Sequence, residues 1–118
     1  MRGQTNALAG LSAEACVAKT YERRGCDISN RRWRGAEGEI DLVARDGPEL
    51  IFVEVKKSRD FAQAAQRLSQ RQMQRIYASA EEYLAGEPRG ELTPARFDVA
   101  LVNEKGAVEI VENAFGHG

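Results

Sequence analysis

The sequence predicts an α/β or α+β fold in which a mixed β-sheet is flanked by helices. Three observations lead to this class. Four β-rich segments form two hairpin patterns, an amphipathic segment precedes them, and a longer one lies between the hairpins. A helix that joins two groups of strands in one sheet favours a mixed sheet with helices on its faces. The 118 residues suffice for one hydrophobic core, so we expect a single domain over 1–118.

Two segments carry helical periodicity. Residues 6–24 place apolar side chains along one stripe and are followed by Gly25, a residue type that commonly ends helices. Residues 61–84 contain neither glycine nor proline and predict one long amphipathic helix. Looser alternation over 26–34 predicts a strand that runs into a turn-rich stretch.

The hairpins are predicted by strands and turns together. The runs 39–44 and 49–56 flank Asp46-Gly47-Pro48, which is a typical turn sequence. The runs 95–103 and 107–111 are separated by a short polar turn in the same way. We therefore expect the first hairpin before the long helix and the second after it.

The charge balance excludes some classes of protein and leaves others open. The chain has 17 Lys and Arg against 18 Asp and Glu, a net charge of −1, which argues against a strongly basic DNA coat protein. The charges are nevertheless unevenly distributed, with a net charge of +4 over 1–76 and −5 over 77–118. A local basic surface is therefore compatible with the near-neutral total.

Cysteine usage and hydropathy bear on the compartment. Cys16 and Cys26 form no CxxC pair and have no neighbouring histidine, which argues against a zinc site or a disulfide scaffold. They are expected to be small buried residues. No segment reaches the length of apolar sequence that spans a membrane. We expect a cytoplasmic protein without membrane association.

Alternation along the first hairpin gathers acidic side chains and a lysine. If Gly47-Pro48 is a two-residue turn, Asp41 lies opposite Glu54, and Glu39 lies opposite Lys56 on the same face. Facing carboxylates repel each other and require a compensating charge, for which Mg²⁺ is the natural candidate. Lys56 would then act on the attacking water or on phosphate charge, which favours phosphodiester hydrolysis. The alternative is a solvated sheet face with a Glu39–Lys56 ion pair.

The same residues carry a resemblance to a known superfamily. The strings GEIDL at 38–42 and FVEVK at 52–56 resemble the PD-(D/E)XK nucleases. They are still more similar to the YraN-like family of small predicted endonucleases, related to archaeal Holliday junction resolvases. The likeness extends along nearly the whole chain, through Gly10 with Glu14, the basic stretch 30–34 and the RFD string at 96–98.

The resemblance implies a restriction-endonuclease-like core and a set of roles. Asp41 and Glu54 would bind Mg²⁺ or Mn²⁺, Lys56 would be the catalytic lysine, and Glu39 an auxiliary acid. Glu14 enters only through the resemblance, as a supporting catalytic acid and metal ligand, and its alternative is a glutamate on a helix surface. The chain departs from the family at Gln72, where a lysine is usual, and at Ala62, where glycine is frequent.

Basic side chains indicate where a nucleic acid could lie. An arginine at every fourth position of the predicted long helix lines one helix face, although a solvated surface would show the same pattern. Trp33 is either a base-stacking residue or part of the core and receives no site assignment. The candidate DNA-binding residues are Arg31, Arg32, Arg34, Lys57, Arg59, Arg67, Arg71 and Arg75.

Three functions remain open from the sequence. The leading hypothesis is a Mg²⁺- or Mn²⁺-dependent DNA endonuclease, acting on branched or structured DNA as a possible homodimer. The second is a non-catalytic nucleic-acid-binding or DNA-repair scaffold on the same fold. The third is an interaction module that docks a partner through its acidic C-terminal hairpin.

Overall fold

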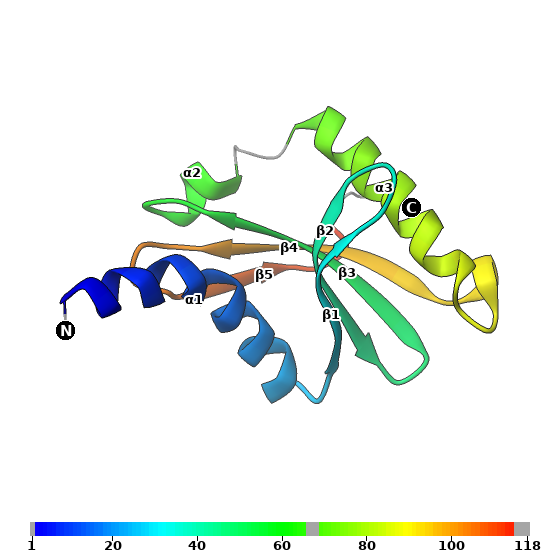
Figure 1. The fold of residues 1–118 in the computed structure, drawn as a ribbon, viewed down its shortest axis with the longest axis horizontal. Helices are drawn as coiled ribbons and strands as arrows, with labels where there is room; N and C mark the ends of the chain where they lie inside the picture. Colours follow the sequence, from blue (N-terminus) through cyan, green and yellow to red (C-terminus); the bar gives the residue numbers. More distant parts are fainter. Residues whose placement is uncertain (1, 66–68, 115–118) are drawn as a thin grey trace.

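A mixed five-stranded sheet with helices packed against it forms the fold (Figure 1). The computed structural model describes residues 2–65 and 69–114. The elements in chain order are α1 (Arg2–Arg23), β1 (Asp27–Arg34), β2 (Glu39–Asp46), β3 (Glu49–Lys57), α2 (Phe61–Ala65), α3 (Gln70–Ala85), the 3₁₀ turn η1 (Gly90–Leu92), β4 (Ala95–Val102) and β5 (Val108–Val111).

The strands follow the order β1-β2-β3-β4-β5, with β3 and β4 parallel and the other neighbours antiparallel. This arrangement confirms the predicted mixed sheet and the α/β class. The first hairpin pairs Asp46 with Glu49 and continues to Leu42 with Val53, which is the predicted register. Gly47 has a φ of 59° at the turn, a backbone conformation that glycine adopts without steric cost.

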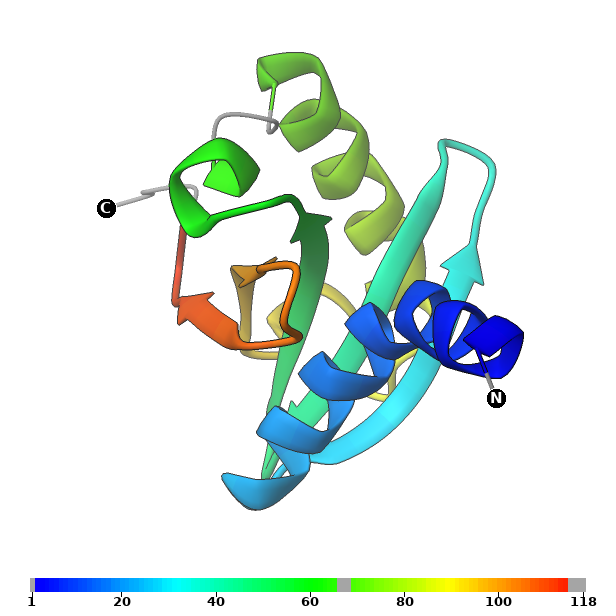
Figure 2. The ribbon, with the colours of Figure 1, turned by 90° about the vertical axis from the view of Figure 1, so that its left-hand side faces the viewer.

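Helices cover both faces of the sheet. Leu42 and Val53 belong to the core cluster beneath α1, whereas Val43 and Phe52 belong to the cluster beneath α3. Because successive strand residues point to opposite faces, these neighbours place the two helices on opposite sides of β2 and β3, as Figure 2 shows. Glu54 alternates with Val53, so its side chain lies on the α3 face.

The predicted helix over 61–84 is wrong as one element, because α2 ends at Ala65 and α3 begins at Gln70. Ser69 has extended backbone angles, and its Oγ accepts a hydrogen bond from the backbone N–H of Gln72. The side chain of Gln72 accepts from the N–H of Ser69 in return, which completes a capping box. These local hydrogen bonds start a new helix within a stretch whose periodicity indicates continuity.

The RFD string that entered through the resemblance forms a buried network. Asp98 is fully buried and accepts hydrogen bonds from the Tyr21 hydroxyl at 2.7 Å and from Arg96 Nε at 3.0 Å. It also accepts from the backbone N–H of Asn113 at 3.0 Å. Asp98 therefore ties α1, β4 and the segment after β5 together, which is a structural role.

Other residues singled out in the sequence have structural positions. The Trp33 ring packs edge-on against Tyr83 with 5.2 Å between ring centroids, which places it in the core cluster beneath α3. Cys26 is buried and Cys16 half-buried, and both are free thiols. His117 lies outside the described residues. Within 2–65 and 69–114, no helix is long and apolar enough to cross a membrane.

Candidate active site

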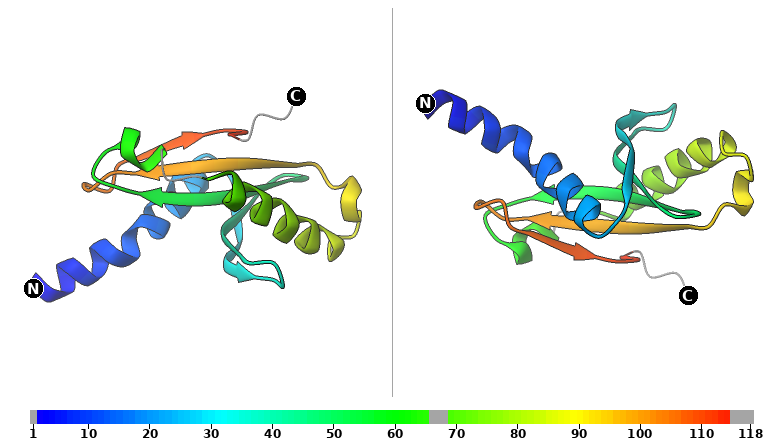
Figure 3. Two further views of the ribbon diagram at one scale, coloured as in Figure 1. Left: turned by 90° about the horizontal axis from the view of Figure 1, so that it is seen from above. Right: turned by 90° about the horizontal axis from the view of Figure 1, so that it is seen from below.

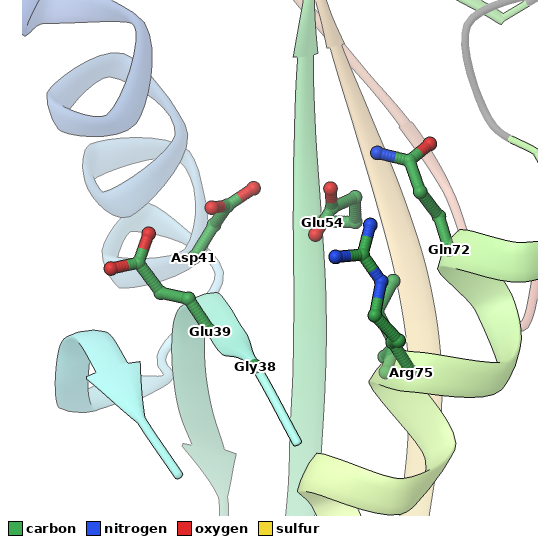
Figure 4. Close-up of a pocket in the computed structure, with 7 residues that line it drawn as sticks. Gly38, Glu39, Asp41, Glu54, Gln72 and Arg75 are labelled. Carbon is green, nitrogen blue, oxygen red and sulfur yellow. The ribbon is translucent and has the colours of Figure 1, made fainter. Parts of the chain in front are cut away.

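A cleft opens where β2 separates from β3. The pairing of the two strands ends at Leu42 and Val53, and the Asp41 side chain accepts a hydrogen bond from the backbone N–H of Val55 at 2.8 Å. A carboxylate thus satisfies a backbone group that the ladder leaves unpaired. The cleft has a volume of about 200 Å³ and is lined by Gly38, Glu39, Asp41, Glu54, Gln72, Arg75 and Ile76 (Figure 4).

Asp41 and Glu54 form a half-buried acid pair in this cleft. The charge of Asp41 opposes ionisation of Glu54, so the two acids influence each other's protonation. Burial raises the pKa of both groups, and together with the charge of Asp41 it raises the pKa of Glu54 to about 7. Glu54 therefore takes up a proton near neutral pH, well above the ordinary pKa of a glutamate.

Lys56 lies beside this pair. Its Nζ is 3.2 Å from Glu54 Oε2, and both side chains are only 12% exposed. The alternative of an ordinary solvated sheet face is wrong, because the side chains of such a face would be largely exposed to water and these two are not. Sequence alternation correctly placed Asp41, Glu54 and Lys56 on one face, and the structure brings them together.

Glu39 lines the cleft but does not pair with Lys56. Its Oε2 lies 3.5 Å from a guanidinium nitrogen of Arg34, and its side chain is 37% exposed. The predicted Glu39–Lys56 pairing is wrong for a physical reason. The last residue of β2 that pairs with β3 is Leu42, three positions from Glu39, so the strands are no longer paired there.

Glu14 extends from α1 toward the same region and is bound by Arg32. Arg32 Nε donates to Glu14 Oε1 at 3.0 Å, and Arg32 has a φ of 51°, which is uncommon for a residue with a side chain. The Glu14 charge contributes to raising the pKa of Asp41. Across the described part of the chain, no three Asp, Glu, His or Cys side chains converge as a metal site, so Glu14 as a ligand stays a prediction.

Of the predicted DNA-binding residues that the structure describes, Arg75 is the one that lines the cleft. Arg71 is exposed one turn earlier on α3, and Arg67 lies outside the described residues. Because α3 begins at Gln70, the arginine stripe on this helix consists of Arg71 and Arg75. The remaining predicted residues are exposed on β1 and around the end of β3, namely Arg31, Arg32, Arg34, Lys57 and Arg59.

Sequence reasoning missed Gln72 as a site residue. In the sequence it stands out only for its departure from the family lysine, yet its side chain lines the cleft together with Arg75 and Ile76. These three residues stand at positions i, i+3 and i+4 of α3 and so share one helix face. That spacing was a usable signal, but which face of α3 meets the sheet depends on tertiary packing.

The turn between β1 and β2 supports the same wall of the cleft. It projects out of the sheet toward α3 (Figures 1 and 3), where the backbone N–H of Ala36 donates to Glu82 Oε1 at 2.9 Å. The Tyr83 hydroxyl lies 2.6 Å from Asn30 Oδ1 on β1. These bonds connect α3 to the hairpin that carries Gly38, Glu39 and Asp41.

The sheet and the cleft define a mixed α/β protein with a half-buried acid pair and a lysine at one site. Residues 13–102 match the model of the uncharacterised protein family UPF0102, and this chain belongs to that family. The match includes every residue of the acid pair, Lys56 and Glu14.

Several UPF0102 proteins are similar over almost their whole length. One from Ruegeria pomeroyi is 63% identical over 117 residues, which covers 99% of this chain and 95% of that protein. One from Cereibacter sphaeroides is 61% identical over 115 residues, or 98% of each chain. One from Dinoroseobacter shibae is 42% identical over 112 residues, or 95% of this chain and 84% of that protein.

Proposed function

We propose that this protein is a metal-dependent endonuclease with a restriction-endonuclease-like core that hydrolyses phosphodiester bonds in DNA. One observation carries the proposal. Asp41 and Glu54 form a half-buried pair in an open cleft, and Lys56 Nζ lies 3.2 Å from Glu54 Oε2. Keeping two acids and a lysine in a desolvated cluster costs stability, and such clusters are typical of functional sites. The resemblance of GEIDL and FVEVK to PD-(D/E)XK nucleases supports the same activity.

The donor set fits a hard divalent cation. Asp41 and Glu54 supply oxygen ligands, and Mg²⁺ and Mn²⁺ are commonly held by one or two carboxylates. Both carboxyl groups line the cleft, so they are the residues that would hold the metal. When bound, the cation would supply Lewis-acid stabilisation of negative charge on the scissile phosphate. Glu14 and Glu39 would add negative charge around it.

Lys56 has the position expected of the catalytic lysine. Its ammonium group is held beside Glu54 by an ion pair and by burial, so it is oriented before any substrate arrives. In that place it would stabilise negative charge on the reacting phosphate or orient the attacking water. The basic side chains around the cleft would bind the DNA backbone without reading its sequence, which suits recognition of branched DNA by shape. A homodimer that binds two arms of such DNA is part of this proposal.

Cleavage assays test the proposed activity directly. Purified protein is incubated with Mn²⁺ or Mg²⁺ and supercoiled, linear, flapped or four-way DNA, and the products are separated on gels. We expect nicking that is lost in D41A and K56A and retained in K105A, because Lys105 is exposed in the turn after β4 and outside the cleft. Activity retained in both D41A and K56A would contradict the proposal. Binding of DNA without metal, with no cleavage products under any metal, would favour the non-catalytic scaffold.

Metal binding provides a second test that does not depend on turnover. Binding of Mn²⁺ requires ionised carboxylates and must displace the proton that Glu54 holds below its pKa of about 7, so we expect about one proton released per cation near pH 6. Calorimetric titration in two buffers of different ionisation enthalpy measures this release. E54Q should bind Mn²⁺ at least about tenfold more weakly. Equal affinity of the wild type and E54Q would show that the metal does not use Glu54.

A further inference from the structure

The two walls of the cleft carry opposite chemistry. Asp41 and Glu54 project from β2 and β3, whereas Gln72 and Arg75 project from α3 (Figure 4). The acid wall attracts cations and repels anions. An anionic group that enters the cleft finds hydrogen-bond donors on the α3 wall, in addition to the Lys56 ammonium group beside Glu54.

The capping box at the start of α3 determines how the Gln72 amide is oriented. The backbone N–H of Ser69 lies 3.2 Å from Gln72 Oε1. A backbone N–H can only donate, so the atom that meets it is the carbonyl oxygen and not the amide nitrogen. The Nε2 group is consequently directed the opposite way, and Figure 4 shows it turned toward the side of Glu54.

Arg75 provides a second donor one helical turn along the same face. Within the described residues, its guanidinium forms no ion pair, although the acidic wall lies across the cleft. Figure 4 shows this group reaching into the cleft beside Glu54. A guanidinium and an amide N–H₂ that converge on one space are the donors that recognise phosphate oxygens.

We propose that Gln72 and Arg75 form a phosphate-binding subsite on the α3 wall, in which the Ser69 cap orients the Gln72 donor. This inference rests on the proposed function and assigns to α3 the contact with a backbone phosphate of the DNA substrate. The Gln72 oxygen thus caps the helix, and its nitrogen is available to donate to the substrate. The place where the predicted helix is interrupted is also the place where this donor is positioned.

Substitution of Gln72 by glutamate separates these two roles. Q72E keeps an oxygen acceptor for the Ser69 N–H, and Ser-x-x-Glu is itself a favourable capping box, so α3 should form normally. The donor, however, is replaced by a carboxylate facing the acid pair. Q74E is the matched control, because it introduces the same charge on the same helix at an exposed position outside the cleft.

Binding of a fluorescein-labelled DNA duplex is measured by anisotropy in chelator at low salt, alongside thermal unfolding. We expect Q72E to remain folded and to bind at least about tenfold more weakly than Q74E. Nuclear magnetic resonance supplies a direct readout with inorganic phosphate as the probe. The side-chain amide signals of Gln72 should shift during the titration, and those of Gln74 should not.

The outcomes separate this inference from the proposed function. The subsite would be overturned if the wild type binds and cleaves DNA, Q72E binds DNA as well as Q74E does, and the Gln72 amide signals do not shift with phosphate. The nuclease proposal would remain standing in that case. Absence of metal-dependent cleavage together with a phosphate-induced shift of the Gln72 amide would overturn the nuclease proposal and support the subsite.

Discussion

The raised pKa of Glu54 makes the stability of the protein dependent on pH. The pKa of Glu54 is raised from 4.5 to about 7 by burial and by the Asp41 charge. The folded state therefore holds a proton that the unfolded chain releases above its ordinary pKa. This contribution is fully present below about pH 4.5 and is lost as the pH rises through about 7.

Replacement of Glu54 by glutamine should remove this dependence. Near pH 5 we expect E54Q and the wild type to be similarly stable, and near pH 8 we expect E54Q to be more stable by about 2 to 3 kcal/mol, since one pKa unit corresponds to about 1.4 kcal/mol. Urea unfolding at both pH values measures the difference. E91Q, which alters an exposed glutamate of η1, is the control and should behave as the wild type at each pH. Lower stability of E54Q near pH 8 would contradict the assignment.

The packing of α3 on the β1–β2 turn holds one wall of the cleft in place. Gly35 lies so close to α3 that an added Cβ would be 2.4 Å from Glu82 Oε1 and 2.7 Å from the Trp33 ring. The Glu82 carboxylate can move, but the Trp33 ring cannot move freely because it packs against the core cluster beneath α3. The absence of a side chain at position 35 is thus a condition for this contact.

A methyl group at Gly35 should loosen the turn. We expect G35A to lower the free energy of unfolding by about 1 to 3 kcal/mol, because overpacking forces neighbouring groups to shift. G86A is the matched control, since Gly86 has a φ of −88° and an added Cβ would make an ordinary contact at 3.6 Å. Urea denaturation compares the two variants. Equal stability of G35A and G86A would show that the turn accommodates the methyl group.

The exposed basic side chains that we propose to bind DNA belong to three distant parts of the chain. They come from β1, from the end of β3 and from α3, whereas much of the acidic excess lies in residues 77–118. A net charge of −1 is therefore a sum of opposing regions and does not argue against DNA binding. Affinity that depends on such a surface should fall steeply as salt is added.

The salt dependence can be assigned to particular arginines. We expect the slope of log affinity against log salt to decrease by about one for each phosphate contact removed, so by about two in a variant carrying R71A and R75A. R89A removes an exposed arginine outside the cleft and should leave the slope unchanged. Anisotropy titrations at several salt concentrations measure the slopes. An unchanged slope in the double variant would place the DNA elsewhere.

Local pattern was sufficient for the strands, the first turn and the register of the hairpin. Alternation and turn chemistry act over a few residues, so the sequence alone places Asp41, Glu54 and Lys56 on one strand face. The same local reasoning failed at Ser69, where apolar periodicity predicted one helix and a capping box began another. A capping box can begin a new helix within a segment of continuous apolar periodicity, and the spacing of apolar residues does not reveal it.

The remaining features depend on how separate elements meet in space. The separation of β2 from β3 removed the expected Glu39–Lys56 pair, and the docking of α3 brought Gln72 to the acid pair. Burial of Glu54, which raises its pKa, likewise results from the packed sheet and α3 and not from its neighbours in the chain. Sequence thus specified which residues share a strand face, because that is a property of the backbone. Tertiary packing decided their desolvation and their partners, because both arise from groups that are remote along the chain.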